Sequence, residues 1–420
     1  MELDNIASQP MSLFFQILMK RFIKVGTVHV IDHVGRKRSY VGAPALPEIT
    51  MRLHTAAIAY QLCVNPDLAL GEGYMNGDIT VEGGSIYDLL FVLCCNQSHG
   101  AFSMLQKWHM KGKQILKHWI SRISLAKAKS NVAHHYDLPP SLYGLFLDDD
   151  WQYSCAYFTE LSNDINAAQL DKKRHLAAKL RLEPNQTVLD IGCGWGGLAL
   201  HLAQTENVRV VGLTLSEEQY KVATERAKKA GLSDRVQFLL QDYREISGQY
   251  DRIVSVGMFE HVGLAQYNTF FSQVYALLAP DGLAVLHSVG SEYDPGASSP
   301  WIEKYIFPGG YIPTLSEVLP AIEHKRFHVT DIEILHHHYA ATLRAWRQRF
   351  LANLKQLPKH LDERFVRMWE YYLAGSEISF QKRGLMIFQI QLMKNKEQVP
   401  LTRDYIYEYE HQPALHAYIR

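Results

Sequence analysis

The sequence predicts an α/β fold in which a seven-stranded, mostly parallel sheet with helices on both faces follows a smaller α+β domain. From about residue 131 onward, apolar strand-like runs alternate with helix-length segments, which is typical of a parallel sheet. One of these runs turns through several glycines into a helix pattern. Nearer the N-terminus, an alternating pattern around Gly35 is typical of a hairpin.

The hairpin pattern belongs to the smaller predicted domain, residues 1–105. Residues 25–41 alternate on both sides of Gly35. The stretch "PEITMRLHTAAIAYQLCVNPDLALGEGYMNGDITVEG", residues 47–83, then reads as a helix, a turn and a further strand. Together these segments predict a compact α+β unit.

A basic amphipathic linker is expected over residues 106–130. Between Lys107 and Lys129 the chain carries seven Lys or Arg and no acid, interleaved with apolar residues such as Trp108 and Trp119. Such a stretch can rest on anionic lipid, and the alternative is a solvated linker. The shorter stretch 14–24 has the same character, with an ordinary docking helix as its alternative.

The larger predicted domain covers residues 131–395 and leaves 396–420 as a C-terminal tail. A Gly/Pro-rich insert, residues 290–313, interrupts it. The seven strand-like runs are Thr187–Ile191, Val208–Leu213, Val236–Leu240, Arg252–Val256, Leu283–Ser288, Val329–Leu335 and Leu385–Leu392.

Composition bounds the class of protein. The formal net charge is +0, which gives no global electrostatic argument for binding nucleic acid. The 5 cysteines are odd in number and show no CxxC spacing, so we expect a reducing compartment such as the cytoplasm. The longest apolar run, Leu89–Cys95, is far shorter than the roughly 18 residues that a membrane span needs, and no signal peptide is expected.

The glycine-rich segment "VLDIGCGWGG", Val188–Gly197, predicts a ligand close to the backbone. Gly192, Gly194 and Gly197 satisfy GxGxxG, but a nicotinamide site also needs an acid after the second strand, where this chain has Thr214. The form D-x-G-x-G-x-G resembles instead the S-adenosylmethionine loop of Rossmann-like methyltransferases. The segment "LLQDYRE" agrees, since such proteins carry an acid there near the adenine.

Methylation of nucleic acid is disfavoured. Enzymes that methylate exocyclic amines of bases carry [DNS]-P-P-[YFW] after the fourth strand, and cytosine C5 enzymes carry Pro-Cys there. This chain has "SVGMFEHVG" in that place. The segment "DLPPSLY" resembles the first motif only superficially and precedes the glycine loop.

Several long motifs in one order resemble the cyclopropane-fatty-acyl-phospholipid synthase family, relatives of the mycolic acid cyclopropane synthases. They are "HHYDLPPSLYGLFLDDDWQYSCAYF", "VLDIGCGWGG", "GLTLSEEQ", "GMFEHVG", "LHSVG", "YIFPGGYIPTLSE" and "EYYLAGSEISF". The resemblance implies an N-terminal lipid-binding domain and an enzyme that adds a methylene from S-adenosylmethionine to cis double bonds of membrane phospholipids. Two alternatives stay open: a C-methyltransferase of an acyl chain or a small molecule without ring closure, and a catalytically silent lipid-binding module.

The chemistry implied by this family explains which groups the site needs. Methyl transfer to an isolated alkene leaves a carbocation in the acyl chain, which an anion and aromatic faces can stabilise. A base must then remove a proton from the new methyl group so that the ring closes. Water must be excluded, because hydration of the cation would give an alcohol.

In the family that these motifs resemble, that base is a bound bicarbonate. The resemblance maps its holders to the side chains of Glu260, His287 and Tyr339 and to the backbone amides of Cys155 and Val289. Cys155 also allows a nucleophile or metal-ligand reading, but no Cys-His signature supplies an activating base, so a backbone role is favoured.

The resemblance also assigns cofactor contacts and partners. No metal is expected, because the consecutive histidines 336–338 cannot all face one ion on a regular strand or helix. The expected partners are unsaturated phospholipid and an anionic membrane surface at the inner face of the cell membrane, with no nucleic acid and with a homodimer left open. The expected cofactor-binding residues are Tyr153, Ser154, Gly192, Gly194, Thr214, Leu215, Gln219 and, near the adenine, Asp242.

Overall fold

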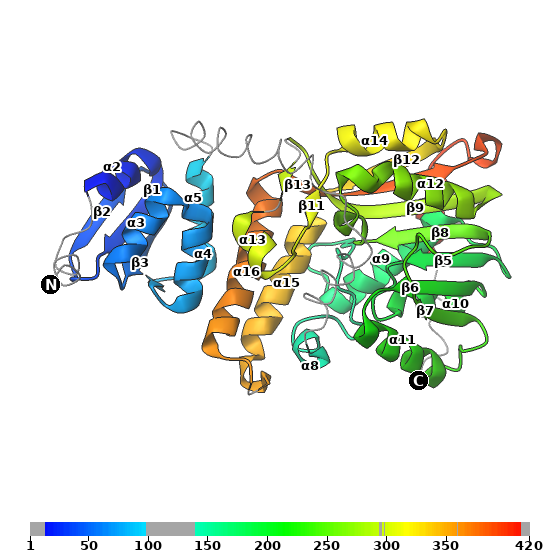
Figure 1. The fold of residues 1–420 in the computed structure, drawn as a ribbon, viewed down its shortest axis with the longest axis horizontal. Coiled ribbons are helices and arrows are strands. Elements are labelled where there is room, and N and C mark those ends of the chain that lie inside the picture. Colours follow the sequence, from blue (N-terminus) through cyan, green and yellow to red (C-terminus); the bar gives the residue numbers. More distant parts are fainter. Residues whose placement is uncertain (1–12, 98–138, 294–295, 298, 359, 413–420) are drawn as a thin grey trace. The chain divides into compact units, whose positions relative to one another are not determined.

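The computed structural model describes residues 13–97, 139–293, 296–297, 299–358 and 360–412, which form two compact units (Figure 1). Unit 1 combines the N-terminal region, Met1–Trp119, with Ala297–Pro308 and Trp346–Gly384. Unit 2 comprises the remaining segments, Ile120–Gly296, Gly309–Ala345 and Leu385–Arg420. The expected linker, residues 106–130, lies outside the described residues.

Unit 1 contains a four-stranded sheet in the order β2-β1-β3-β4, in which β1 and β3 run parallel and the outer pairs are antiparallel. The predicted hairpin is confirmed, because β1 and β2 pair across a turn where Gly35 has a φ of +85°. The elements are α2 (Leu13–Phe22), β1 (Val25–Ile31), β2 (Lys37–Val41), β3 (Ala43–Leu53), α3 (Ala56–Val64), α4 (Pro66–Asn76), β4 (Ile79–Glu82), α5 (Ile86–Gln97), α13 (Pro300–Tyr305) and α16 (Glu363–Lys382).

The start of the segment 47–83 differs from the prediction. Residues up to Leu53 continue strand β3 instead of opening a helix. Ile49, Met51 and Leu53 are buried while the residues between them are more open, and this period of two places them on one face of the sheet. Two helices, not one, then precede β4.

Two later segments pack against the N-terminal helices within unit 1. The Trp301 indole on α13 donates to Met75 Sδ on α4 at 3.1 Å. The Tyr74 hydroxyl, also on α4, donates to the Glu370 carboxylate on α16 at 2.7 Å. Trp301 is buried, so these segments share one apolar interior with the N-terminal elements.

Unit 2 confirms the predicted sheet of seven strands, in the order β12-β13-β9-β8-β5-β6-β7. The strands from β9 to β7 are parallel, and β13 pairs antiparallel with both β9 and β12. The strands are β5 (Thr187–Ile191), β6 (Arg209–Thr214), β7 (Val236–Leu240), β8 (Tyr250–Val256), β9 (Leu278–Ser291), β12 (His328–Leu335) and β13 (Leu385–Met393).

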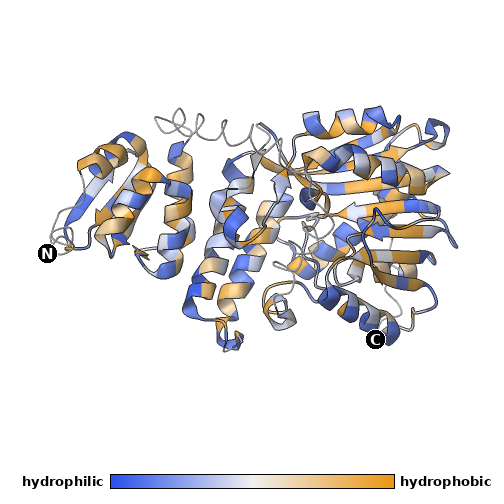
Figure 2. Cartoon of the chain, in the orientation of Figure 1, coloured by the Kyte–Doolittle hydropathy of each residue, from blue (hydrophilic) through white to orange (hydrophobic). Residues whose placement is uncertain are grey.

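Helices cover both faces of this sheet (Figure 1). Leu189 and Ile253 pack in a core with α12 and α14, whereas Val188 and Val254 pack in a second core with α9, α10 and α11. Figure 2 accordingly shows the strands as largely apolar. The other elements are α8 (Pro140–Tyr143), α9 (Ile165–Leu180), α10 (Gly197–Thr205), α11 (Glu217–Lys229), α12 (Tyr267–Leu277), β10 (Gly296–Ala297), β11 (Tyr311–Ile312), α14 (Leu315–His324), α15 (His338–Ala352), which is shared between the units, and α17 (Asp404–His411).

Within the described ranges, none of the helices combines the length and the apolar character that crossing a bilayer requires.

Candidate active site

The glycine loop joins β5 to α10 at the carboxyl edge of the parallel strands. Gly192 and Gly194 have φ values of +88° and +55°, a backbone conformation that side chains disfavour. A Cβ on Gly192 would also lie 2.8 Å from the Met258 Cβ. The amides of Gly192 and Cys193 donate to the Leu213 carbonyl, which anchors the loop to β6. The sequence therefore needs glycine here for backbone geometry and for close packing.

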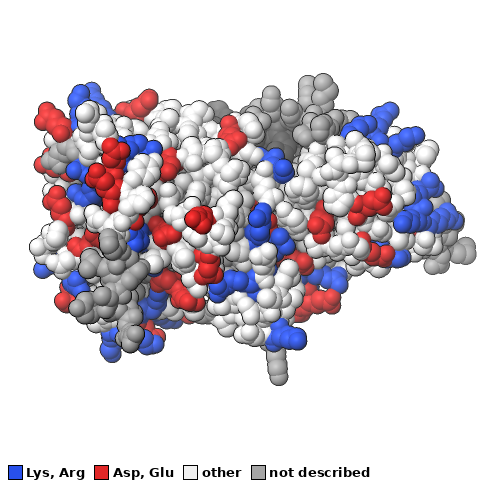
Figure 3. Space-filling view, turned by 180° about the vertical axis from the view of Figure 1, so that it is seen from behind, with Lys and Arg blue, Asp and Glu red and all other residues white. Residues whose placement is uncertain are grey.

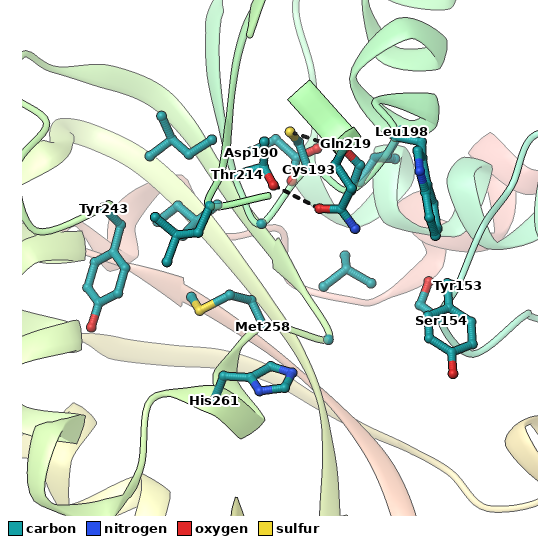
Figure 4. Close-up of a pocket in the computed structure, with 18 of the residues that line it drawn as sticks. Tyr153, Ser154, Asp190, Cys193, Leu198, Thr214, Gln219, Tyr243, Met258 and His261 are labelled. Carbon is teal, nitrogen blue, oxygen red and sulfur yellow. Dashed lines mark hydrogen bonds between the residues drawn. The ribbon is translucent and has the colours of Figure 1, made fainter. Parts of the chain in front are cut away.

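This loop forms one wall of a pocket at the edge of the sheet (Figure 4). Open α/β sheets place their ligands at this edge. Figure 4 shows Tyr153 and Ser154 on one side of the cavity and Tyr243 on the other. The structure brings every predicted cofactor-binding residue to the lining of this pocket: Tyr153, Ser154, Gly192, Gly194, Thr214, Leu215, Gln219 and Asp242.

Hydrogen bonds hold two polar parts of the lining in place. The Thr214 hydroxyl donates to Gln219 Oε1 at 2.8 Å, linking the end of β6 to the start of α11. Arg244 binds the Asp242 carboxylate through two nitrogens, at 2.8 and 2.7 Å. Asp242 is thus a fixed, charge-compensated acceptor at the end of β7, and such a group suits hydroxyl or amine donors of a nucleoside.

Sequence reasoning missed Met258 and His261, two side chains that line the cavity in Figure 4. Burial lowers the pKa of His261 to about 4, so the ring is neutral at physiological pH. Both residues flank Glu260 in "GMFEHVG", and their position within that motif was the available signal. Glu260 itself lies between them in a short 3₁₀ helix, Phe259–His261, and is not among the residues that line this pocket.

Two buried titratable groups, Asp190 in the pocket lining and Lys172, have shifted pKa values. Burial raises the pKa of Asp190, at the end of β5, to about 7, although the nearby Lys172 ammonium opposes the rise. Burial also lowers the pKa of Lys172 to about 8. The Lys172 ammonium donates to Gln152 Oε1 at 2.6 Å and to Ser154 Oγ at 2.8 Å, and it thereby holds the loop that leads to Cys155.

Glu260 and Val289, two of the predicted catalytic positions, are in direct contact. The Val289 amide donates to Glu260 Oε1 at 2.6 Å, so this amide is engaged by the side chain of Glu260. Burial raises the pKa of Glu260 to about 7, although hydrogen bonds from the Val289 amide, from its own amide and from the Ser288 side chain act in the opposite direction. Within the described part of the chain, Glu260 Oε2 is buried and has no hydrogen-bond partner. His287 lies two residues before Val289 on β9 and is also buried.

The other two predicted positions, Cys155 and Tyr339, lie where a loop meets the start of α15. The Ala156 amide donates to the Thr342 hydroxyl at 3.0 Å, and the Phe158 amide donates to His338 Nδ1 at 2.9 Å. Tyr339 thus sits between two residues that hold the Cys155 loop. Burial raises the pKa of the Cys155 thiol far above its ordinary value, which disfavours a thiolate.

The charge of Lys172 acts on one residue of the Cys155 loop and on one residue of strand β9, near Val289. Its positive charge acts on the pKa of both Cys155 and His287, which places both residues within its electrostatic reach. The histidine run has separate partners, because His336 Nδ1 lies 2.9 Å from Glu292 Oε1 while His338 accepts from the Phe158 amide. Among the residues that the structure describes, no group of three His, Cys, Asp or Glu side chains could hold a metal ion.

The sheet order and the glycine loop at the end of β5 define an S-adenosylmethionine-dependent methyltransferase of the Rossmann-like class. Coclaurine N-methyltransferase bound to SAH shares this fold, with a TM-score of 0.64 at 22% identity over 77% of this chain and 99% of that chain. The chain belongs to the mycolic acid cyclopropane synthetase family, whose model matches residues 123–390. A second family model, described as a domain of unknown function, matches residues 14–103.

Individual relatives agree with this membership and confirm the resemblance seen in the motifs. The chain is 43% identical over 263 residues to the cyclopropane-fatty-acyl-phospholipid synthase of Escherichia coli K12, covering 63% of this chain and 67% of the relative. It is 37% identical to a probable fatty acid methyltransferase of Pseudomonas putida, covering 66% and 73%. The solved cyclopropane synthase MmaA2 of Mycobacterium tuberculosis superimposes with a TM-score of 0.60 at 31% identity, covering 63% and 97%.

Proposed function

We propose that this protein is a cyclopropane-fatty-acyl-phospholipid synthase, which adds a methylene group to the cis double bond of an unsaturated phospholipid. Family membership supports the reaction class. The observation that carries the proposal within the structure is Glu260, a buried carboxyl with a pKa of about 7 and one oxygen left without a partner among the described residues.

The glycine-loop pocket fits S-adenosylmethionine, which supplies a methyl group on a sulfonium centre when it is bound. Gly192 and Gly194 allow a ligand to lie against the backbone. Asp242 would accept hydrogen bonds from the nucleoside, and Thr214 and Gln219 would form a polar wall beside it, since all three line the pocket. The chain's part in this step is to orient the donor, which converts an encounter of two molecules into a reaction at fixed geometry.

The residues around Glu260 fit a small oxyanion that carries a proton, and bicarbonate would supply a weak base there. The unpartnered Glu260 Oε2 can accept a hydrogen bond from the ligand's hydroxyl. His287 would donate to the ligand, with Tyr339 and the amides of Cys155 and Val289 as the remaining holders. The Val289 amide would then be shared with Glu260.

Burial at these positions supports the exclusion of water that a carbocation requires. Cys155 is 1% exposed, His287 2% and Ser288 0%. The aromatic rings of Phe259 and Tyr267 stack with their centroids 4.4 Å apart. Phe259 precedes Glu260 in the chain, and the charge of Glu260 acts on the pKa of Tyr267. Aromatic faces stabilise a nearby cation without reacting with it.

We propose that helix α2 is a membrane-contacting surface of unit 1, which would hold the enzyme at the inner face of the cell membrane. Leu13, Phe14 and Ile17 are 72%, 61% and 42% exposed on this helix, whereas Phe15 and Met19 face the core. Lys20, Arg21 and Lys24 adjoin them, and Figure 3 shows basic side chains, with acidic ones among them, over the N-terminal elements. Each such residue contributes about 1 kcal/mol near an anionic surface.

Labelled S-adenosylmethionine and vesicles of cis-unsaturated, anionic phospholipid test the activity. We expect label in the acyl chains and a product that is one CH2 heavier and resists catalytic hydrogenation, unlike an alkene. Absence of label in lipid, with cofactor binding intact by calorimetry, would reject the proposed function.

Methylation without ring closure is the second candidate. It is supported by two relatives that are each 37% identical to the chain, a probable fatty acid methyltransferase and a tuberculostearic acid methyltransferase. NMR of the labelled product separates the two, because only a cyclopropane gives ring-proton signals. A methyl-branched product that lacks ring-proton signals would support methylation without ring closure and contradict cyclopropane formation.

A further inference from the structure

Gln389 on β13 contacts the His287 ring. In the antiparallel register Gln389 lies directly opposite His287 of β9, so both side chains project from the same face of the sheet. The Gln389 amide nitrogen, Nε2, lies 3.1 Å from His287 Nδ1. Gln389 is 0% and His287 2% exposed, and a buried polar pair of this kind destabilises the fold unless its groups bond to each other.

The His287 ring is neutral. Burial lowers its pKa well below the ordinary value, and the positive charges of Lys172, Lys179 and His175 act in the same direction. A neutral imidazole has one N–H donor and one lone-pair acceptor, and the partner of one nitrogen decides which is which. A donor facing Nδ1 makes Nδ1 the acceptor and leaves the proton on Nε2.

The orientation of the Gln389 amide follows from the count of unpaired groups. With Nε2 on the histidine, the Gln389 carbonyl oxygen is buried without a partner among the described residues. With the amide reversed, the carbonyl oxygen would accept from His287 Nδ1, and both N–H groups of Gln389, rather than one, would lack the histidine as a partner. Buried carbonyl oxygens that lack a partner are tolerated more often than buried N–H groups.

We propose that Gln389 is a positioning residue that fixes His287 in the tautomer with its proton on Nε2, so that Nε2 acts as a hydrogen-bond donor to the anion. This inference rests on the proposed function, in which His287 helps to hold a bicarbonate ion. In the opposite tautomer the ring would turn a lone pair toward an anion, and the two would repel. Gln389 itself is not among the residues that line the glycine-loop pocket.

Two substitutions separate the tautomer from packing. Gln389→Glu places a carboxylate opposite Nδ1 and favours the tautomer with the proton on Nδ1. Gln389→Met keeps the volume and removes the amide. Gln391→Met is the matched control, because Gln391 is also buried on β13 but donates to the Lys179 carbonyl and the Tyr405 hydroxyl, away from His287.

The kinetic readout is turnover on unsaturated vesicles in carbonate-depleted buffer with bicarbonate added back. We expect both Gln389 variants to raise the KM for bicarbonate roughly 10- to 100-fold, by analogy with the loss of an outer partner of a metal-binding histidine. Affinity for S-adenosylmethionine should be unchanged, and Gln391→Met should leave the KM for bicarbonate as in the wild type. An unchanged KM in both Gln389 variants overturns the inference.

The spectroscopic readout needs no variant at position 389. With 15N-labelled histidine and the His287 signals assigned by their loss in His287→Asn, the wild type should show a protonated Nε2 and an unprotonated Nδ1. A protonated Nδ1 overturns the inference even if the Gln389 variants do not fold. Turnover of the wild type that is independent of bicarbonate would instead contradict the proposed function, so the two failures are distinguishable.

Discussion

Glu260 has a folded-state pKa suited to chemistry near neutral pH. Its folded pKa of about 7 lies above the ordinary value of 4.5 because burial disfavours the charge. The anion-holding role requires the ionised form, so activity and stability depend on pH in opposite directions. The ionised Glu260 carboxylate costs stability in its buried site, and the proposed reaction requires it there.

The variant Glu260→Gln tests whether activity and stability depend on pH in opposite directions. With bicarbonate held constant, wild-type kcat/KM should rise as the pH increases through about 7. The variant should lose turnover by on the order of 10²–10⁴-fold and show no such rise. Cofactor affinity, measured by calorimetry, should be retained.

The same variant should be the more stable protein in alkaline buffer. Because the folded pKa exceeds the unfolded value, the contribution of Glu260 to stability is present below about 4.5 and is lost as the pH rises through about 7. The unfolding temperature of Glu260→Gln should therefore be higher than that of the wild type at pH 8. The two unfolding temperatures should be similar at pH 4. A wild type that is more stable at pH 8 would contradict the burial argument.

Gly192→Ala tests the pocket as a cofactor site. The new Cβ would meet Met258 at 2.8 Å, on a backbone with φ of +88°. We expect affinity for S-adenosylmethionine to fall at least tenfold by calorimetry, as strain of about 1–3 kcal/mol moves the loop. Gly231→Ala is the control, since Gly231 has a φ of +66° and nothing within 4 Å of a Cβ. Equal losses in both variants would mean that backbone strain alone is responsible.

Cys155→Ser distinguishes a backbone role from a nucleophilic one. The buried thiol has a raised pKa and donates to the Ala156 carbonyl at 3.2 Å, which a hydroxyl can also do. We expect the variant to keep substantial activity in the vesicle assay. Complete loss with an unchanged unfolding temperature would restore the nucleophile.

At the scale of elements, the sequence predicted well what depends on local pattern. The strands of the large sheet are rich in apolar residues, and the glycine loop has a fixed spacing of glycines. The contact of Gln389 with His287 had no local signal, because it arises only when β13 pairs with β9 across 102 positions of sequence. The segment 47–53 was misread because its period of two merges into a helix after Leu53.

The predicted C-terminal tail, residues 396–420, contains helix α17 (Asp404–His411), which packs on α9 and includes the buried Ile406. Glu410 of this helix bonds His175, whose ring stacks on Tyr157 with centroids 4.1 Å apart. Tyr157 in turn stacks on His338, beside Tyr339. The last helix thus supports the loop that carries Cys155.

Removing residues 404–420 should therefore affect the site from a distance. We expect the unfolding temperature to fall by on the order of 5 °C, since the contacts of Ile406 and Glu410 are lost. Turnover should fall as well, while removal of 413–420 alone, which spares α17, should leave both unchanged. Full turnover without α17 would show that the Cys155 loop holds its shape unaided.

At the scale of the whole molecule, the formal net charge is +0, but the charged residues are unevenly distributed along the chain. The segment 13–43 contains six Lys or Arg residues and one acid, Asp32, which is buried. A net charge of +0 therefore does not argue against attraction of this segment to an anionic surface.

Charge reversal on α2 tests membrane contact. Lys20→Glu with Arg21→Glu should weaken sedimentation with anionic vesicles at least tenfold at low salt and should reduce the salt dependence of binding. Lys228→Glu with Lys229→Glu on α11 gives the same change in net charge on unit 2. Equal weakening by both pairs would show that only total charge matters, whereas cofactor affinity should be unaffected by either.

The assembly of unit 1 from three stretches of chain limits how this enzyme can be dissected. Trp301 and Glu370 belong to the later stretches, and their partners Met75 and Tyr74 belong to the first. A recombinant fragment that starts after residue 105 would carry the later helices with their inner faces bared to solvent, and bared aromatic surface promotes aggregation. Point changes on the outside of the N-terminal region will therefore report on its role more cleanly than excision.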